Sequence, residues 1–221
     1  MAYSHYWYRP ARLRAQTQAR IIKDLKPLFG RLREIVPLAI SDGEYLATYE
    51  SIVLASGIFF NGYAKDPDYD GDGSHESFVF PWQIDRLSKR SSHDKYSSLK
   101  FDCCKTARKP YDIAVQTVLI VISHHLNTDP AGVGMIVNSD GEDAEWEEAR
   151  CLVFQVLGYG ADFHIGDPKE PELPRPKPKA NGPGGLTCGA FDCHVKLTLE
   201  TAIYDIDRKA YLCYAHAEVK V

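Results

Sequence analysis

A basic loop that leads directly into a strongly apolar helix is the most constraining feature of this chain. Residues 113–122 are almost entirely apolar, and Pro110 suits the first turn of a helix because its missing N–H is not needed there. A helix that covers one face of a sheet needs a single apolar stripe, whereas this segment is apolar around most of its circumference. We therefore expect a buried central helix, whose surplus apolar surface is covered by the last helix or by a second subunit.

The order of the predicted elements indicates an α+β fold. Periodicity predicts strands at 5–9, 52–63, 76–82 and 133–138, helices at 11–36, 142–157 and from the basic loop to about 126, and a polar excursion over 83–100. Pro27 is expected to kink or break the first helix. This order matches the ferredoxin-like split β-α-β sandwich, in which both main helices cover one face of a four-stranded antiparallel sheet. The helix over 142–157 is an extra C-terminal element.

Composition divides the chain into three parts. We expect a ferredoxin-like body over 1–158, a proline-rich linker over 159–185 and a β-hairpin arm over 186–221. The arm contains two β-rich runs, 195–204 and 210–219. Because an isolated hairpin is marginal in water, the arm should dock on the body, dock on another subunit or be held by a metal.

Bulk properties exclude several classes of protein. The 221 residues are 44% apolar with a formal net charge of −4, which predicts a sizeable core and argues against nonspecific nucleic-acid binding by the whole surface. No apolar run approaches the roughly 18 residues of a membrane span. The N-terminus has no hydrophobic signal core, so the protein is expected to be intracellular and cytoplasmic, or else exported without a cleaved signal. The six cysteines do not force a disulfide framework.

Six motifs follow one another along residues 3–157. They are His5-Tyr6-Trp7-Tyr8-Arg9, Phe60-Asn61-Gly62, Glu76-Ser77-Phe78-Val79-Phe80-Pro81, Cys104-Lys105-Thr106-Ala107-Arg108-Lys109-Pro110-Tyr111-Asp112, His124-His125 and Ser139-Asp140-Gly141. In this pattern the chain resembles a family of uncharacterised proteins of bacteria and fungi. The resemblance implies no mechanism. It also implies that the linker and the hairpin are additions, which could carry a separate role.

The basic loop predicts an anion site at the start of the central helix. A helix N-terminus favours negative charge, so clustered cations there are unfavourable unless an anion or acidic side chains compensate. The predicted ligands of a phosphate, sulfate or carboxylate are Lys105, Thr106, Arg108, Lys109 and Tyr111. The alternative is that the cations pair with nearby acids, namely Asp102, Asp112 and Glu76.

Three further patterns each have two interpretations. The acidic loop over 66–76 begins like a calcium-binding EF-hand loop, but Ser77 stands where that loop needs glutamate, so a solvated hairpin loop is favoured. Zinc could be held by Cys188, Cys193, Cys213 and His216, although ordinary buried cysteines are favoured. His124 and His125 are interpreted as a helix terminus, where the dipole favours cationic side chains.

The N-terminal aromatic residues alternate along the first predicted strand. Either His5 and Trp7 or Tyr6 and Tyr8 share a sheet face near Phe78 and Phe80, an arrangement similar to the stacking platform of RNA-recognition modules. Alternatively, one set packs under the helices. The net negative charge and the missing glycine-aromatic RNA signature make nucleic acid an unlikely partner.

These patterns favour a non-catalytic binding or self-assembly protein. No nucleophile motif, P-loop or zinc-protease motif occurs. A homo-oligomer is expected through the central helix and the arm, which can add strands to a neighbour's sheet. The alternative is an enzyme acting on a phosphorylated small molecule, with Asp112, His5 or Glu76 as proton-transfer groups and a cleft at the start of the central helix.

Overall fold

The computed structural model describes two compact units of the chain. The first unit is Met1–Pro168 and the second is Lys169–Val221. The described residues are 3–40, 43–84, 99–130 and 133–166, together with four short strands: β9 (Leu186–Thr187), β10 (Lys196–Leu197), β11 (Ile203–Asp205) and β12 (Ala210–Leu212). In the second unit β9 pairs with β10 and β11 with β12, both antiparallel, and the latter pair overlaps the runs 195–204 and 210–219 expected to form the hairpin.

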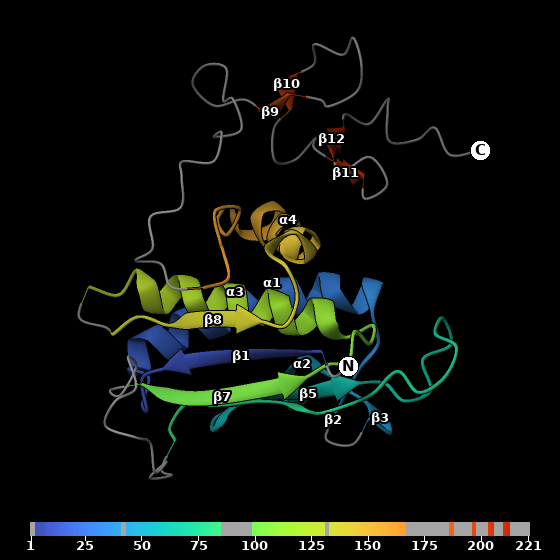
Figure 1. The fold of residues 1–221 in the computed structure, drawn as a ribbon, viewed down its shortest axis with the longest axis horizontal. Coiled ribbons are helices and arrows are strands. Elements are labelled where there is room, and N and C mark those ends of the chain that lie inside the picture. Colours follow the sequence, from blue (N-terminus) through green and yellow to red (C-terminus); the bar gives the residue numbers. More distant parts are fainter. Residues whose placement is uncertain are drawn as a thin grey trace. The chain divides into compact units, whose positions relative to one another are not determined.

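A three-stranded antiparallel sheet forms around the N-terminal strand. The central β1 (Ser4–Arg9) lies between β7 (Lys100–Lys105) and β8 (Ile136–Ser139), as Figure 1 shows. Side chains of β1 alternate strictly, because successive residues of a strand point to opposite faces, and His5, Trp7 and Arg9 are the buried set. Strand β7 was not predicted from the sequence, since its residues were assigned to the polar excursion and the basic loop.

The second antiparallel sheet is built around β5 (Gly57–Gly62). Its other strands are β2 (Leu38–Ile40), β3 (Tyr45–Leu46), β4 (Val53–Leu54) and β6 (Phe78–Pro81). The expected strand over 52–63 is thus a short helix, α2 (Tyr49–Ile52), followed by β4, a reversal and β5. The α+β class is confirmed, but the described strands of the first unit form two sheets where a single four-stranded ferredoxin-like sheet was expected.

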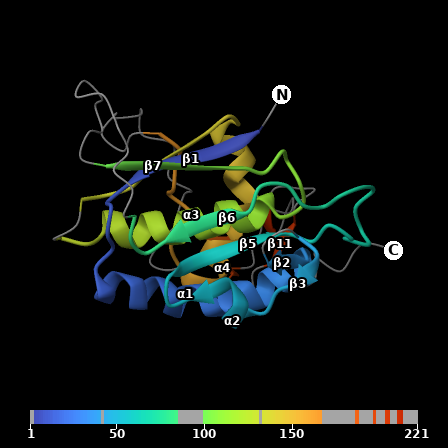
Figure 2. The same ribbon diagram turned by 90° about the horizontal axis from the view of Figure 1, so that it is seen from below.

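Three longer helices complete the first unit. They are α1 (Ala15–Ile35), α3 (Asp112–Asn127) and α4 (Glu147–Leu157), which follows a 3-10 turn, η1 (Asp143–Trp146). Of these, α4 packs on α3 and α1. Pro27 lies inside a continuous α1, so the helix does not break there. Figure 2 shows α3 between the β1–β7 sheet and α1.

The central helix is buried within its own chain. Every residue from Ala114 to Ser123 is buried, and both α1 and α4 pack against α3. Of the two alternatives for its surplus apolar surface, the last helix is therefore correct, with α1 contributing as well. The burial of α3 gives no support to a subunit interface through this helix, and the expected homo-oligomer stays a prediction.

Candidate functional site

The basic loop is a tight turn between β7 and α3. Lys109 N donates to Thr106 O at 3.0 Å, and the two residues between them, Ala107 and Arg108, have φ angles of 50° and 57°. This is the geometry of a type I′ turn, which non-glycine residues rarely adopt. The main-chain N–H groups of Thr106 and Ala107 both donate to Tyr3 O at 3.1 Å. The chain itself therefore holds most of the loop amides.

Two of the predicted anion ligands are buried anchors of this turn. Thr106 is fully buried and its hydroxyl donates to Asp112. Tyr111 is also fully buried, and its hydroxyl donates to Glu76 O at 2.6 Å, with Lys105 O at 3.2 Å. Burial raises the pKa of Tyr111. Both residues hold the loop in place and neither presents a polar atom to a ligand at the surface.

The three cations of the loop lie at its surface. Arg108, with a side chain 58% exposed, forms an ion pair with Glu145 and lies 4.0 Å above the Tyr3 ring. The Arg108 guanidinium holds the pKa of Glu145 below its ordinary value. Lys109 Nζ donates to the main-chain oxygen of Asp72.

The exposed Lys105 differs from the other two cations. Its main-chain N–H donates to Glu76 Oε2 at 2.8 Å, and its ammonium forms no ion pair within the described part of the chain. Among the described contacts, the expected acids Asp102, Asp112 and Glu76 form no ion pair with a loop cation. The carboxylate that pairs with Arg108 is that of Glu145, 37 residues further along the chain. No local sequence signal could have identified this partner.

A histidine–aspartate pair lies directly beneath the loop. His5 Nε2 lies 2.7 Å from Asp112 Oδ1, and Gln116 Nε2 donates to Asp112 Oδ2 at 2.9 Å. His5 is fully buried between the edges of Tyr3 and Trp146, and its Nδ1 finds no partner among the described residues. Two of the three expected proton-transfer groups thus come together. Asp112 also places the chain's own carboxylate at the positive end of α3.

The cysteines of β7 are not activated nucleophiles. Burial is the main cause that raises the pKa of both thiols. Cys104 is fully buried and its sulfur lies 3.5 Å from Glu76 O. Because the thiolate is the reactive form, a raised pKa favours the unreactive thiol in both side chains.

The faces of β1 separate the two sets of aromatic residues. His5 and Trp7 face the core, where the Trp7 ring lies 5.4 Å from Phe78 and 6.1 Å from Phe80. Tyr6 and Tyr8 occupy the opposite face and contact Phe101 of β7, which the sequence analysis did not consider. The inner set packs under the helices, and the outer set lies half-buried on the opposite face of the sheet.

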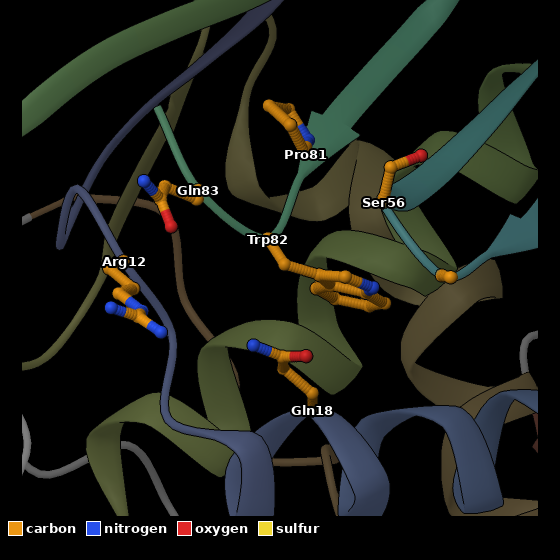
Figure 3. Close-up of a pocket in the computed structure, with 7 residues that line it drawn as sticks. Arg12, Gln18, Ser56, Pro81, Trp82 and Gln83 are labelled. Atoms are coloured by element: carbon orange, nitrogen blue, oxygen red, sulfur yellow. The ribbon is translucent and has the colours of Figure 1, made fainter. Parts of the chain in front are cut away.

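The pocket in Figure 3 lies away from the basic loop. It has a volume of about 430 Å³ and is lined by Arg12, Gln18, Ala55, Ser56, Pro81, Trp82 and Gln83. The buried Trp82 forms its floor and donates from Nε1 to Leu54 O at 3.2 Å. This pocket is where α1 begins and β6 ends, so it is not the cleft that the enzyme interpretation expected at the start of α3.

The two histidines at the end of α3 are part of a tertiary contact. His125 Nε2 and the Tyr159 hydroxyl each lie 2.8 Å from Asp24 Oδ2, and the His124 ring stacks on Tyr159 at 3.7 Å. This cluster joins α1, α3 and the segment after α4. It agrees with the interpretation as a helix terminus, but Asp24 and Tyr159 were not anticipated.

The metal predictions fall partly outside the described residues. The zinc prediction stays a prediction, because its four ligands lie outside the described residues: Cys188, Cys193, Cys213 and His216. Within the described ranges, no group of three or more His, Cys, Asp or Glu side chains could hold a metal ion. In the acidic loop, Asp66 and Asp72 instead accept main-chain hydrogen bonds from Asp68 and Ser74.

The helices that the structure describes include none with the length and apolarity needed to cross a membrane. Comparison of the chain with family models, with curated proteins and with solved structures finds no match.

Proposed function

We propose that this chain is a non-catalytic binding protein whose basic loop, residues 105–109, contacts an anionic partner. The observation that carries the proposal is the position of Lys105, Arg108 and Lys109 on one short turn, with Lys105 and Arg108 exposed. The buried anchors Thr106 and Tyr111 hold the turn in shape. A loop that is already ordered loses little conformational entropy when it binds, which favours recognition.

The internal partners of the loop leave room for an external anion. The Arg108–Glu145 ion pair is exposed to solvent, with side-chain exposures of 58% and 32%. Exposed ion pairs contribute only about 0–1 kcal/mol, so a phosphate or a carboxylate can compete with Glu145. The Lys105 ammonium forms no ion pair within the described ranges, although its main-chain N–H donates to Glu76 Oε2.

The groups beneath the loop support binding over catalysis. His5 is buried, Asp112 accepts three hydrogen bonds within the chain, and Cys104 has a raised pKa. Self-assembly through the central helix is not part of the proposal, because α1 and α4 cover that helix.

Thermal unfolding in phosphate or sulfate tests the anion site. For a Kd of about 1 mM, about 10 mM phosphate should stabilise the protein by about 1.4 kcal/mol. That corresponds to a rise in Tm of roughly 3–6 °C. Sodium chloride should weaken the effect by screening. Arg108→Ala should abolish most of the rise, and Glu145→Gln should enlarge it because the competing carboxylate is removed.

Arg31 supplies a matched control for Arg108. Its side chain is 59% exposed and pairs with Glu34 on the surface of α1. Arg31→Ala should therefore leave the response to phosphate unchanged. An unchanged Tm of the wild-type protein in phosphate, or an equal loss in the two alanine variants, would contradict the proposal.

A second candidate is an enzyme that acts on a phosphorylated small molecule. The 2.7 Å contact between His5 and Asp112 favours it, since these residue types transfer protons. Arg108 and Lys109 would then hold the phosphate. Turnover of a phosphoester that persists in the Arg108→Ala, Lys109→Ala double variant would rule out these roles.

A further inference from the structure

The pocket in Figure 3 has the size and lining of a small-molecule site. Its volume of about 430 Å³ lies within the range of roughly 300–1,000 Å³ that such sites occupy. Its floor is apolar, because Trp82 is buried there and Pro81 and Ala55 also line the pocket. Figure 3 shows Arg12 on one side of Trp82 and Ser56 on the other. An apolar floor with a few polar groups around it is the usual form of a ligand site.

Hydrogen bonds within the chain hold the walls of this pocket in place. Leu13 N donates to Trp82 O at 2.9 Å, which joins the segment before α1 to the residue after β6. Trp82 N donates to Ser56 O at 2.9 Å and Trp82 Nε1 to Leu54 O at 3.2 Å, so the turn between β4 and β5 is joined to the floor as well. Gln18 Nε2 donates to Leu13 O at 2.8 Å. A ligand would therefore meet a preformed site, which lowers the cost of binding.

The lining of the pocket carries a positive charge that the chain does not neutralise. The seven described residues that line it include one cation, Arg12, and no acid. The Arg12 guanidinium forms no ion pair within the described part of the chain, whereas Arg14, two residues later, pairs with Asp129. The sequence has no Asp or Glu before Asp24. An external anion can therefore pair with Arg12 without displacing a carboxylate of the protein.

A second arginine lies behind one wall of the pocket. Arg9 Nη2 donates to the main-chain oxygen of Pro81, which lines the pocket. Arg9 is fully buried, and its Nε and Nη1 atoms find no hydrogen-bond partner among the described residues. Asp102 supplies part of the opposing charge. Because the protein interior screens a buried charge less than water does, Arg9 adds to the attraction of the pocket for an anion.

We propose that this pocket binds a small-molecule carboxylate with a planar apolar body, with the carboxylate on Arg12 and the body against the floor. Arginine presents two parallel N–H donors, which match the two oxygens of a carboxylate. The Ser56 hydroxyl can donate a further hydrogen bond. A single cation in the lining suits a monoanion better than a phosphate dianion. This site is distinct from the basic loop, and the inference does not depend on the proposed function.

Calorimetric titration with 2-naphthoate tests the inference. The comparison ligands are 2-naphthamide, which keeps the rings without the charge, and acetate, which keeps the charge without the rings. Each should bind at least about 5-fold more weakly than naphthoate, because a partly exposed ion pair and the burial of the rings each contribute that much or more. Of the three indole N–H signals in an NMR spectrum, that of Trp82 should shift most when naphthoate is added.

Two variants separate the charge from the shape of the pocket. Arg12→Gln should weaken naphthoate binding at least about 5-fold and leave naphthamide binding unchanged, because only the charged ligand loses a partner. Ala55→Phe should weaken both ligands, since the larger side chain fills the pocket from an exposed turn. Arg31→Gln is the matched control, because Arg31 is 59% exposed on α1 and pairs with Glu34. Thermal unfolding of each variant shows whether its fold is intact.

The inference is overturned by any one of three results. These are no heat of binding up to about 10 mM naphthoate, equal binding of naphthoate and naphthamide, and an equal loss in Arg12→Gln and Arg31→Gln. Inorganic phosphate separates this site from the basic loop. It should weaken naphthoate binding no more than sodium chloride of equal ionic strength does. Stronger displacement by phosphate would assign naphthoate to the basic loop and reject the pocket, while the Tm response to phosphate alone still decides the proposed function.

Discussion

Replacing Arg9 with methionine should stabilise the protein, although Arg9 is fully buried. Its guanidinium makes a single hydrogen bond, from Nη2 to Pro81 O, and lies 4.1 Å above the Phe80 ring. Its Nε and Nη1 atoms find no partner among the described residues. The side chain is thus a buried cation without a carboxylate against it, which is costly to maintain.

The pKa of Arg9 sets the size of the expected effect. Burial lowers the pKa of the guanidinium to about 10, and the opposing attraction of Asp102 does not offset this. At about 1.36 kcal/mol per pH unit, a fall of about 2.5 costs the charged folded state roughly 3 kcal/mol. Methionine removes this cost and keeps the contact with the Phe80 ring. Leaving Pro81 O unpaired costs about 1–2 kcal/mol, so we expect a net gain of about 1–2 kcal/mol.

Arg150 is the matched comparison, because it is also buried but fully paired. It donates to Glu147 Oε2 at 2.8 and 3.2 Å, to Asp143 Oδ2 at 2.8 Å and to Phe163 O at 3.0 Å. Removal of one partner of a buried charge pair costs about 3–5 kcal/mol. The carboxylates of Asp143 and Glu147 are partly exposed, so Arg150→Met should lower the free energy of unfolding by an amount near the lower end of this range.

Urea unfolding followed by circular dichroism measures both variants. The Arg9→Met gain should be constant between pH 7 and 9, because Arg9 is charged in the folded and unfolded states over that range. In the wild type, stability should rise only above about pH 10, where Arg9 loses its proton in the folded state first. A loss of stability in Arg9→Met, or equal losses in the two variants, would refute this reasoning.

Four other substitutions are expected to have the following effects on urea unfolding. Gly62→Ala should lower the free energy of unfolding by about 2 kcal/mol or more, because the new Cβ would lie 2.2 Å from Gly73 O. Gly30→Ala should raise it by about 0.5–1 kcal/mol, since alanine is a better helix former and the space around this position is open. Tyr111→Phe should cost about 1–2 kcal/mol, because two main-chain oxygens lose a buried hydroxyl. The pKa of Glu145 is lower in the folded protein than in the unfolded chain, so its carboxylate contributes to the free energy of unfolding above about pH 4.3, the ordinary pKa of a glutamate. This contribution is lost as the pH falls through the lowered pKa of the folded state. Glu145→Gln should therefore flatten the change in stability between pH 5 and 3, and an unaltered acid profile would contradict this.

Part of the fold could be predicted because it depends on local patterns. The apolar run that became α3, the helical spacing in α1 and the alternation in β1 are properties of neighbouring residues. Strand β7 could not be predicted in this way, since its residues include Asp102, two cysteines and two lysines. Pairing with β1 along six positions stabilises it, and strand formation depends strongly on such partners.

Part of the candidate site could also be predicted from local sequence, and part of it depends on tertiary contacts. The cluster of cations in the loop was identified from residue type and position, and so were His5, Asp112 and Glu76 as alternative candidates for proton transfer, of which His5 and Asp112 lie in contact. The partner of Arg108 could not be identified from the sequence, because Glu145 lies 37 residues away and comes close only when α4 packs on α3. Thr106 and Tyr111 were expected to contact a ligand, yet their burial depends on where Tyr3 and Glu76 lie.

The sequence by itself determined that alternate residues of β1 form two sets and that one apolar helix lies at the centre. It could not determine which set of β1 faces the core, because both sets are aromatic and strand periodicity treats them alike. The tertiary structure decided this by the register of β1 against β7 and β8, which places Trp7 on Phe78 and leaves Tyr6 on the outer face. Because side chains alternate with a period of two, a register changed by one residue would exchange the two faces completely.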